Sequence, residues 1–189
     1  MVRQTIAVVA TFTAESVKDC LAFWMQELAI PATIEFAPYG QVFQQLLDPG
    51  SLLAQNQDGI NIVLVRIDDW LQSGDVLESH RNYPGTEDRF LAQLTRSSQD
   101  FVVALRTAAE RSRTPHLVCV CPAAPATLAD SRRAAVLRQL EQQILRDVHL
   151  IRGVFAIGST DLTGLYPVVH YYDPHGEELG HVPYNSAFF

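Results

Sequence analysis

The C-terminal segment of this 189-residue chain, Tyr171–Phe189, holds the densest set of side chains able to do chemistry. It reads YYDPHGEELGHVPYNSAFF and contains two histidines, three carboxylates and three tyrosines. Within it, Glu178 precedes His181 by three residues. An acid close to an imidazole can orient the ring and stabilise its charged form, as a catalytic dyad requires. The spacing therefore indicates a candidate dyad, with an ordinary surface loop as the alternative.

Five short apolar runs alternate with helical patterns and must position this segment. The runs are Thr5–Ala10, Thr33–Phe36, Ile60–Ile67, His116–Cys121 and Val154–Ile157. This alternation is typical of a parallel sheet with helices on both faces, and right-handed crossovers favour a flavodoxin-like strand order. We expect one α/β domain over residues 1–189, folded as a three-layer α/β/α sandwich with a five-stranded parallel sheet.

The helical patterns add two expectations about burial. The first helical pattern begins at about Ala14. In this pattern we expect Phe23 and Trp24 to lie in the core rather than on a ligand-binding surface. Cys119 and Cys121 lie in an apolar run and are expected to be buried strand residues on opposite faces.

Parallel strands leave a sheet at the same edge. The loops that contain Thr11–Thr13, Arg66–Asp69, Pro122–Pro125 and His181 are therefore expected to share one rim, where residues distant in sequence can line a common pocket. No G-x-S-x-G elbow and no glycine-rich phosphate-binding motif occurs in the chain. Nucleotide binding is therefore not expected.

The overall composition argues against several other classes of protein. A net charge of −7 and a pI near 5.3 leave no basic stripe for nucleic acid or for an anionic membrane surface. No apolar run approaches membrane-spanning length and no secretory signal is present, so a cytoplasmic location is expected. Three cysteines are too few and wrongly spaced for a zinc site, and neither a metal nor a cofactor is expected.

Four stretches, in this order, carry a resemblance to a known family: IAVVATFTAE, PATIEFAPYGQVFQQLLDPGSLL, INIVLVRIDDWL and YYDPHGEELGHVPYNSAFF. They resemble the N-terminal domain of FkbH-like proteins, which are also embedded in polyketide and nonribosomal peptide synthases. The resemblance implies an SGNH-hydrolase-like fold and an acyl or peptidyl carrier protein as partner. It also implies that a haloacid-dehalogenase-type domain, with an Asp-x-Asp-x-Thr signature, would follow PYNSAFF. The chain is thus expected to be a domain of a longer polypeptide, without phosphatase or glyceryl-transfer chemistry of its own.

The chain departs from the SGNH pattern at the residues that matter for catalysis. The resemblance places the nucleophilic serine after the first strand, where this chain has Thr11 and Thr13 but no serine. It places an oxyanion-binding asparagine where the chain reads Arg66-Ile67-Asp68-Asp69. Loss of one oxyanion donor costs on the order of 3 kcal/mol in the barrier. The carboxylate of Asp68 adds negative charge where negative charge must develop.

These departures leave three functions open. The first is a catalytically degraded domain that scaffolds or docks a neighbouring domain or a carrier protein. The second is an esterase, thioesterase or acyltransferase acting on a carrier-bound thioester, with Thr11 or Thr13 as nucleophile, His181 as base and Glu178 as its partner. In that case Arg66 would compensate for Asp68; the alternative is that its side chain pairs with Asp68 or Asp69. The third is a small-molecule binding module that uses the former pocket.

Overall fold

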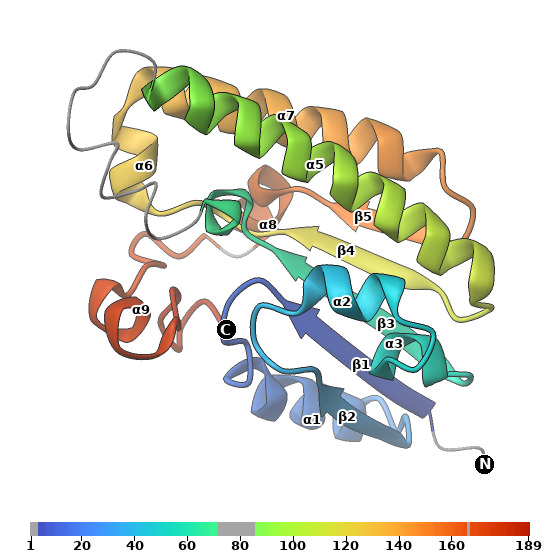
Figure 1. Cartoon of the computed structure of the whole chain (residues 1–189). Coiled ribbons are helices and arrows are strands. Elements are labelled where there is room, and N and C mark those ends of the chain that lie inside the picture. Colours follow the sequence, from blue (N-terminus) through green and yellow to red (C-terminus); the bar gives the residue numbers. More distant parts are fainter. Residues whose placement is uncertain (1–3, 72–85, 166) are drawn as a thin grey trace.

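The computed structural model describes residues 4–71, 86–165 and 167–189. Its centre is one five-stranded, all-parallel sheet (Figure 1). The strands are β1 (Gln4–Ala10), β2 (Ala32–Phe36), β3 (Gly59–Val65), β4 (His116–Val120) and β5 (Val154–Ile157). Their order is β2-β1-β3-β4-β5, which is the flavodoxin-like order. The predicted fold class is confirmed.

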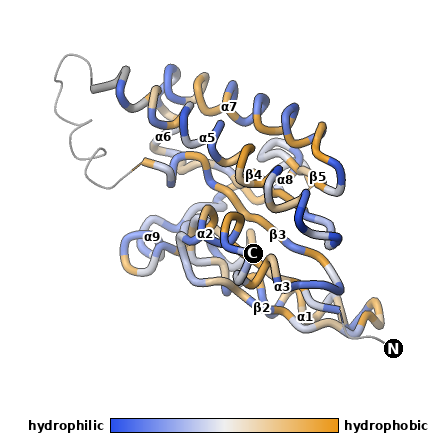
Figure 2. Tube along the Cα trace, turned by 45° about the vertical axis from the view of Figure 1, so that its right-hand side comes forward, coloured by the Kyte–Doolittle hydropathy of each residue, from blue (hydrophilic) through white to orange (hydrophobic). Residues whose placement is uncertain are grey.

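One face of the sheet carries the larger hydrophobic core. Two long helices, α5 (Thr86–Arg111) and α7 (Ser131–His149), run side by side over this face (Figure 1). The short helices α2 (Val42–Leu47) and α3 (Leu52–Gln55) cover the same face. Figure 2 shows hydrophobic and hydrophilic residues alternating along α5 and α7, as amphipathic helices require. The helix α6 (Pro125–Ala129) leads from β4 into α7.

The helix α7 shows how the sequence specifies this layer. The carboxylate of Asp130 caps its first turn by accepting hydrogen bonds from the backbone N–H groups of Arg132 (2.9 Å) and Arg133 (3.1 Å). The apolar positions that recur at helical spacing are buried: Leu137, Leu140, Ile144 and Val148. Each buried aliphatic side chain contributes about 1.5–3 kcal/mol relative to an exposed one.

The second face is covered by α1 (Val17–Glu27), α8 (Ser159–Leu165) and the C-terminal segment with α9 (Pro174–Gly180). The prediction that Phe23 and Trp24 are core residues is wrong, because their side chains are 55% and 56% exposed. The helix packs on the edge strand β2 and buries none of its side chains fully. Cys119 and Cys121 are buried, but they belong to one cluster on this face. The expectation of opposite faces is wrong, since residues two apart in an extended chain point the same way.

Replacement of Trp24 with serine is expected to lower the free energy of unfolding by less than about 1 kcal/mol, because the ring is mostly exposed. Urea denaturation followed by circular dichroism measures this change. Leu105→Ala, at a fully buried position, is the positive control for lost stability. A loss for Trp24→Ser as large as that of the control would contradict the exposed position of α1.

No helix in the described ranges is both long and apolar enough to span a bilayer. The exits of β1, β3 and β4 and the C-terminal segment meet at one edge of the sheet (Figure 1). Polar side chains gather at this edge.

Candidate functional site

The end of β1 and the end of β3 bring Thr11 and Arg66 into contact. The strands are paired through Ala10 and Leu64, so the next residues of each strand also lie together. The backbone N–H of Arg66 donates a hydrogen bond to Thr11 Oγ1 (3.0 Å), and that hydroxyl donates to Asp69 Oδ2 (2.6 Å). The Thr11 side chain is buried. Its hydroxyl therefore already donates one hydrogen bond and accepts another.

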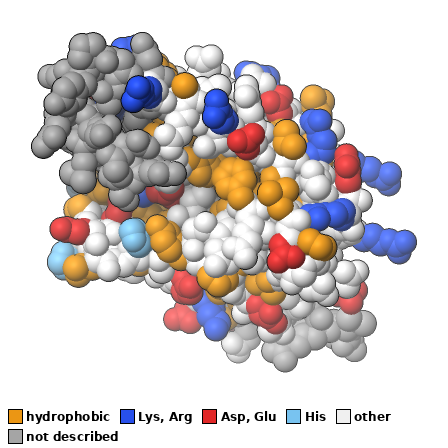
Figure 3. Space-filling view, in the orientation of Figure 1, with side chains coloured by type: hydrophobic (Ala, Val, Ile, Leu, Met, Phe, Trp, Pro, Cys, Tyr) orange, Lys and Arg blue, Asp and Glu red, His pale blue; other side chains and the backbone are white. Residues whose placement is uncertain are grey.

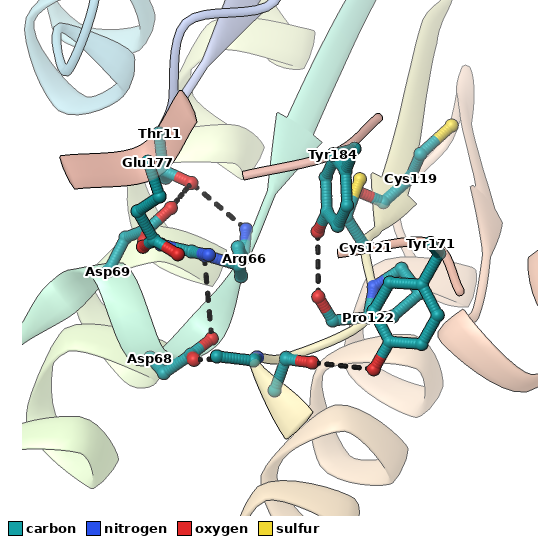
Figure 4. Close-up of polar contacts among 12 residues, drawn as sticks. Thr11, Arg66, Asp68, Asp69, Cys119, Cys121, Pro122, Tyr171, Glu177 and Tyr184 are labelled. Atoms are coloured by element: carbon teal, nitrogen blue, oxygen red, sulfur yellow. Dashed lines mark hydrogen bonds and ion pairs between the residues drawn. The ribbon is translucent and has the colours of Figure 1, made fainter. Parts of the chain in front are cut away.

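Arg66 is the centre of the site (Figure 4). Its Nε donates to Asp69 Oδ1 at 2.7 Å, and its Nη2 contacts both Asp69 and Glu177. Its Nε also lies 3.8 Å from Asp68 Oδ1. Only 6% of Arg66 is exposed, whereas the side chains of Asp69 and Glu177 are 13% and 24% exposed, so the ion pairs are partly buried. We call Thr11, Arg66, Asp68, Asp69 and Glu177 the Arg66 cluster.

Local backbone geometry explains why the aspartates face the arginine. β3 ends at Val65, and η1 (Ile67–Trp70) is a single 3₁₀ turn that begins one residue after Arg66. The backbone N–H of Asp69 donates to the carbonyl of Arg66 at 3.1 Å, which closes the turn. Asp68 Oδ2 accepts a hydrogen bond from the Ala124 backbone N–H (3.2 Å). The two neighbouring carboxylates thus approach the guanidinium from one short turn.

The electrostatics of the cluster are unbalanced, because one guanidinium faces three carboxylates. Burial raises the pKa of Asp69 to about 6, although the charge of Arg66 opposes this shift. Burial also raises the pKa of Asp68. Burial acts in the same direction on Glu177, but its hydrogen bond to Arg66 prevails and the pKa of Glu177 is lowered. The cluster therefore stays paired through Arg66 and Glu177 while the aspartates take up a proton more readily than usual.

The C-terminal segment is fastened to this rim by α9. Asp173 caps the helix, and Glu177 lies in its first turn. The helix ends at Gly180, and His181, which caps it, adopts a left-handed conformation (φ 55°). There the backbone N–H of Thr13 donates to the His181 carbonyl (2.8 Å), and Thr13 Oγ1 donates to the Gly180 carbonyl (2.7 Å). The Thr13 hydroxyl thus holds the tail backbone.

The imidazole of His181 lies apart from the threonine hydroxyls. It stacks on the ring of Tyr39, with 4.6 Å between centroids and 10° between planes. Glu178 is exposed. Among the described residues, no hydrogen bond joins the imidazole to Thr11, Thr13 or Glu178. The structure brings the predicted rim together, with Thr11, Thr13, Arg66 and Asp68 near the tail, but it forms no threonine–histidine–glutamate relay.

The aromatic side chains of the tail close the rim beside β4. Tyr184 Oη donates to the Pro122 carbonyl (2.7 Å), and Tyr171 Oη donates to the Ala123 carbonyl (2.8 Å) (Figure 4). The ring of Tyr184 also packs edge-on against Phe12, with centroids 5.1 Å apart. Burial raises the pKa of the Cys121 thiol below them, so it is not a ready nucleophile.

The pairing of Arg66 with a neighbouring aspartate was expected from the sequence, but two residues of the site were given no role there: Glu177 and Tyr39. A signal existed for Glu177, because Asp173-Pro174 is a typical helix start and places it in the first turn. No comparable signal exists for Tyr39. In the described part of the chain, no group of three or more histidine, cysteine, aspartate or glutamate side chains is arranged to hold a metal ion.

Comparison with known proteins gives a structural likeness. No family model matches the sequence, and the search of curated proteins found no relative. A similar solved structure is a crystal structure of the N-terminal part of the protein BF1531 from Bacteroides fragilis, containing a phosphatase domain complexed with Mg. It superposes with a TM-score of 0.70 at 14% identity, covering 98% of this chain and 48% of that one. The present chain thus spans about half of that crystal chain and shares the fold of that half.

Proposed function

We propose that this chain is a non-catalytic, SGNH-like domain of the FkbH-like type. It serves a polyketide or nonribosomal peptide assembly line by docking a neighbouring domain or an acyl or peptidyl carrier protein. One observation carries the proposal. The buried Thr11 hydroxyl, at the position of the SGNH nucleophile, is bound on both sides by Asp69 and by the backbone of Arg66.

Two chemical requirements of acyl transfer are unmet. A hydroxyl nucleophile needs an adjacent general base and access to substrate, but Thr11 is buried and its neighbouring carboxylate is paired with Arg66. An oxyanion needs donors that are not already engaged. Here Arg66 Nε and Nη2 are bound to Asp69 and Glu177, and only Nη1 has no hydrogen-bond partner among the described residues. The two carboxylates therefore already place negative charge beside the guanidinium. The geometry favours a structural ion-pair cluster over a catalytic centre.

The structural likeness shows a shared fold and carries no chemistry across. The neighbour is described as containing a phosphatase domain complexed with Mg. This chain has no Asp-x-Asp-x-Thr sequence, and its described residues include no metal-binding group of the kind searched for.

The proposal is tested by exposing the full chain to a fluorophosphonate and to an acyl-loaded carrier protein. We expect no covalent adduct by intact mass spectrometry and no acyl release above the spontaneous rate. An SGNH esterase serves as the positive control, and His181→Ala is expected to behave like the wild type. An adduct on Thr11 or Thr13 that disappears in His181→Ala would overturn the proposal and favour the esterase, thioesterase or acyltransferase alternative.

A further inference from the structure

A groove lies at the amino edge of the sheet, opposite the Arg66 cluster. It is bordered by the end of α5, the turn into β4, and the turn between α7 and β5, and its volume is about 610 Å³. Its charged and large apolar lining residues are Arg106, Glu110, Arg113, Leu150, Ile151 and Arg152, and we call it the arginine groove. Figure 3 shows basic side chains protruding from this end of the molecule, on the right of the view.

The guanidinium groups of the groove differ from those of Arg66 and Arg111 in their pairing. Within the described residues, Arg106, Arg113 and Arg152 make no ion pair or hydrogen bond, in contrast to Arg66 and Arg111. One carboxylate, that of Glu110, lies among the three guanidinium groups. The groove therefore carries an excess of positive charge that the rest of the fold does not neutralise.

This excess stands out against the charge of the whole chain. Residues 86–153 contain ten arginines and seven acidic residues, whereas the remainder contains four basic and fourteen acidic residues. Since the net charge of the chain is −7, a long polyanion such as nucleic acid would meet repulsion beyond the groove. Attraction is confined to roughly one Debye length, about 8–10 Å at physiological ionic strength. The fitting partner is therefore compact and acidic.

An apolar anchor completes the surface. Leu150, directly after α7, is 79% exposed and lines the groove together with the arginines. On α5, Val103 precedes Arg106 by one helical turn and is 62% exposed. An acidic amphipathic helix presents carboxylates beside an apolar stripe, and guanidinium groups pair with carboxylates in well-defined geometry.

We propose that the arginine groove docks an acidic amphipathic helix of a partner protein. The arginines pair with its carboxylates, and Leu150 packs on its apolar stripe. The inference deepens the docking role proposed above and rests on it for the kind of partner. Because the groove precedes β4 and β5 while the Arg66 cluster follows β1 and β3, a bound partner leaves the former catalytic rim uncovered.

The test measures binding to the full chain by fluorescence anisotropy. The probes are a labelled glutamate- and leucine-rich helical peptide and a labelled holo acyl carrier protein. We expect Arg106→Glu and Arg113→Glu each to weaken peptide binding about tenfold or more, and added salt to weaken it further. The matched control is Arg96→Glu, an equal charge change at an exposed position of α5 outside the groove. Leu150→Ser is expected to weaken binding without changing its salt dependence.

The outcomes separate this inference from the function on which it rests. If the peptide binds with this pattern and the carrier protein does not bind, the result supports the groove as a docking site for an acidic helix and contradicts the carrier-docking role. If neither probe binds, or if Arg96→Glu weakens binding as much as Arg106→Glu, the groove inference is overturned while the non-catalytic assignment is untouched. Equal binding of single-stranded DNA or anionic vesicles, lost in Arg106→Glu, would also overturn it. Circular dichroism of each variant confirms that the fold is intact.

Discussion

Replacement of Arg66 with alanine is expected to lower the free energy of unfolding by about 3–5 kcal/mol. The substitution leaves the buried carboxylates of Asp68 and Asp69 and the partly buried one of Glu177 without their shared cation. An unpaired charge that is largely shielded from water costs far more than a surface ion pair contributes. The same change is expected to loosen α9, which Glu177 holds to the rim.

Urea denaturation followed by far-ultraviolet circular dichroism measures the loss, and hydrogen exchange of the α9 amides measures the loosening. Arg96→Ala, at an exposed position of α5, is the matched control and is expected to change stability by less than about 0.5 kcal/mol. Arg66→Met combined with Asp69→Asn is expected to recover part of the loss, because it removes both charges of one pair. If Arg66→Ala costs no more than the control, the cluster is not a structural ion-pair centre.

Most of the fold follows from hydrophobic periodicity, and the errors have local physical causes. The run Ile60–Ile67 predicted a strand, but β3 ends at Val65 because Arg66 leads into a 3₁₀ turn whose Ile67 is still apolar and buried. Trp24 lies on an amphipathic stripe, yet its helix packs on an edge strand with too little surface to bury it. Periodicity identifies an apolar face without showing how much surface it meets.

The shared rim was predictable, but the contacts within it were not. Parallel strands place Thr11 and Arg66 at one edge, which the sequence pattern indicates. Which glutamate contacts Arg66 depends on how α9 is oriented about its own axis, since successive residues of an α-helix point about 100° apart. Glu177 therefore faces Arg66 while Glu178 is exposed. A spacing of three residues before His181 cannot reveal that difference.

The difference in stability between the wild type and Asp69→Asn is expected to depend strongly on pH. The pKa of Asp69 is raised from 3.8 to about 6 in the folded protein. Between these two values the native state binds the proton more tightly than the unfolded state does. The contribution of Asp69 is therefore fully present below about pH 4 and is lost as the pH rises through about 6. Two pKa units correspond to about 3 kcal/mol.

The asparagine variant cannot titrate at this position, so the free energy of unfolding of the wild type relative to Asp69→Asn should fall by about 3 kcal/mol from pH 4 to pH 7. Urea denaturation of both proteins at each pH gives this difference. Asp100→Asn, at an exposed position of α5, is the control for general effects of removing a carboxylate. A difference that stays flat for Asp69→Asn, or that rises with pH, would mean that Arg66 holds Asp69 ionised. The cluster would then be a set of fully ionised ion pairs, and Asp69 would not take up a proton near neutral pH.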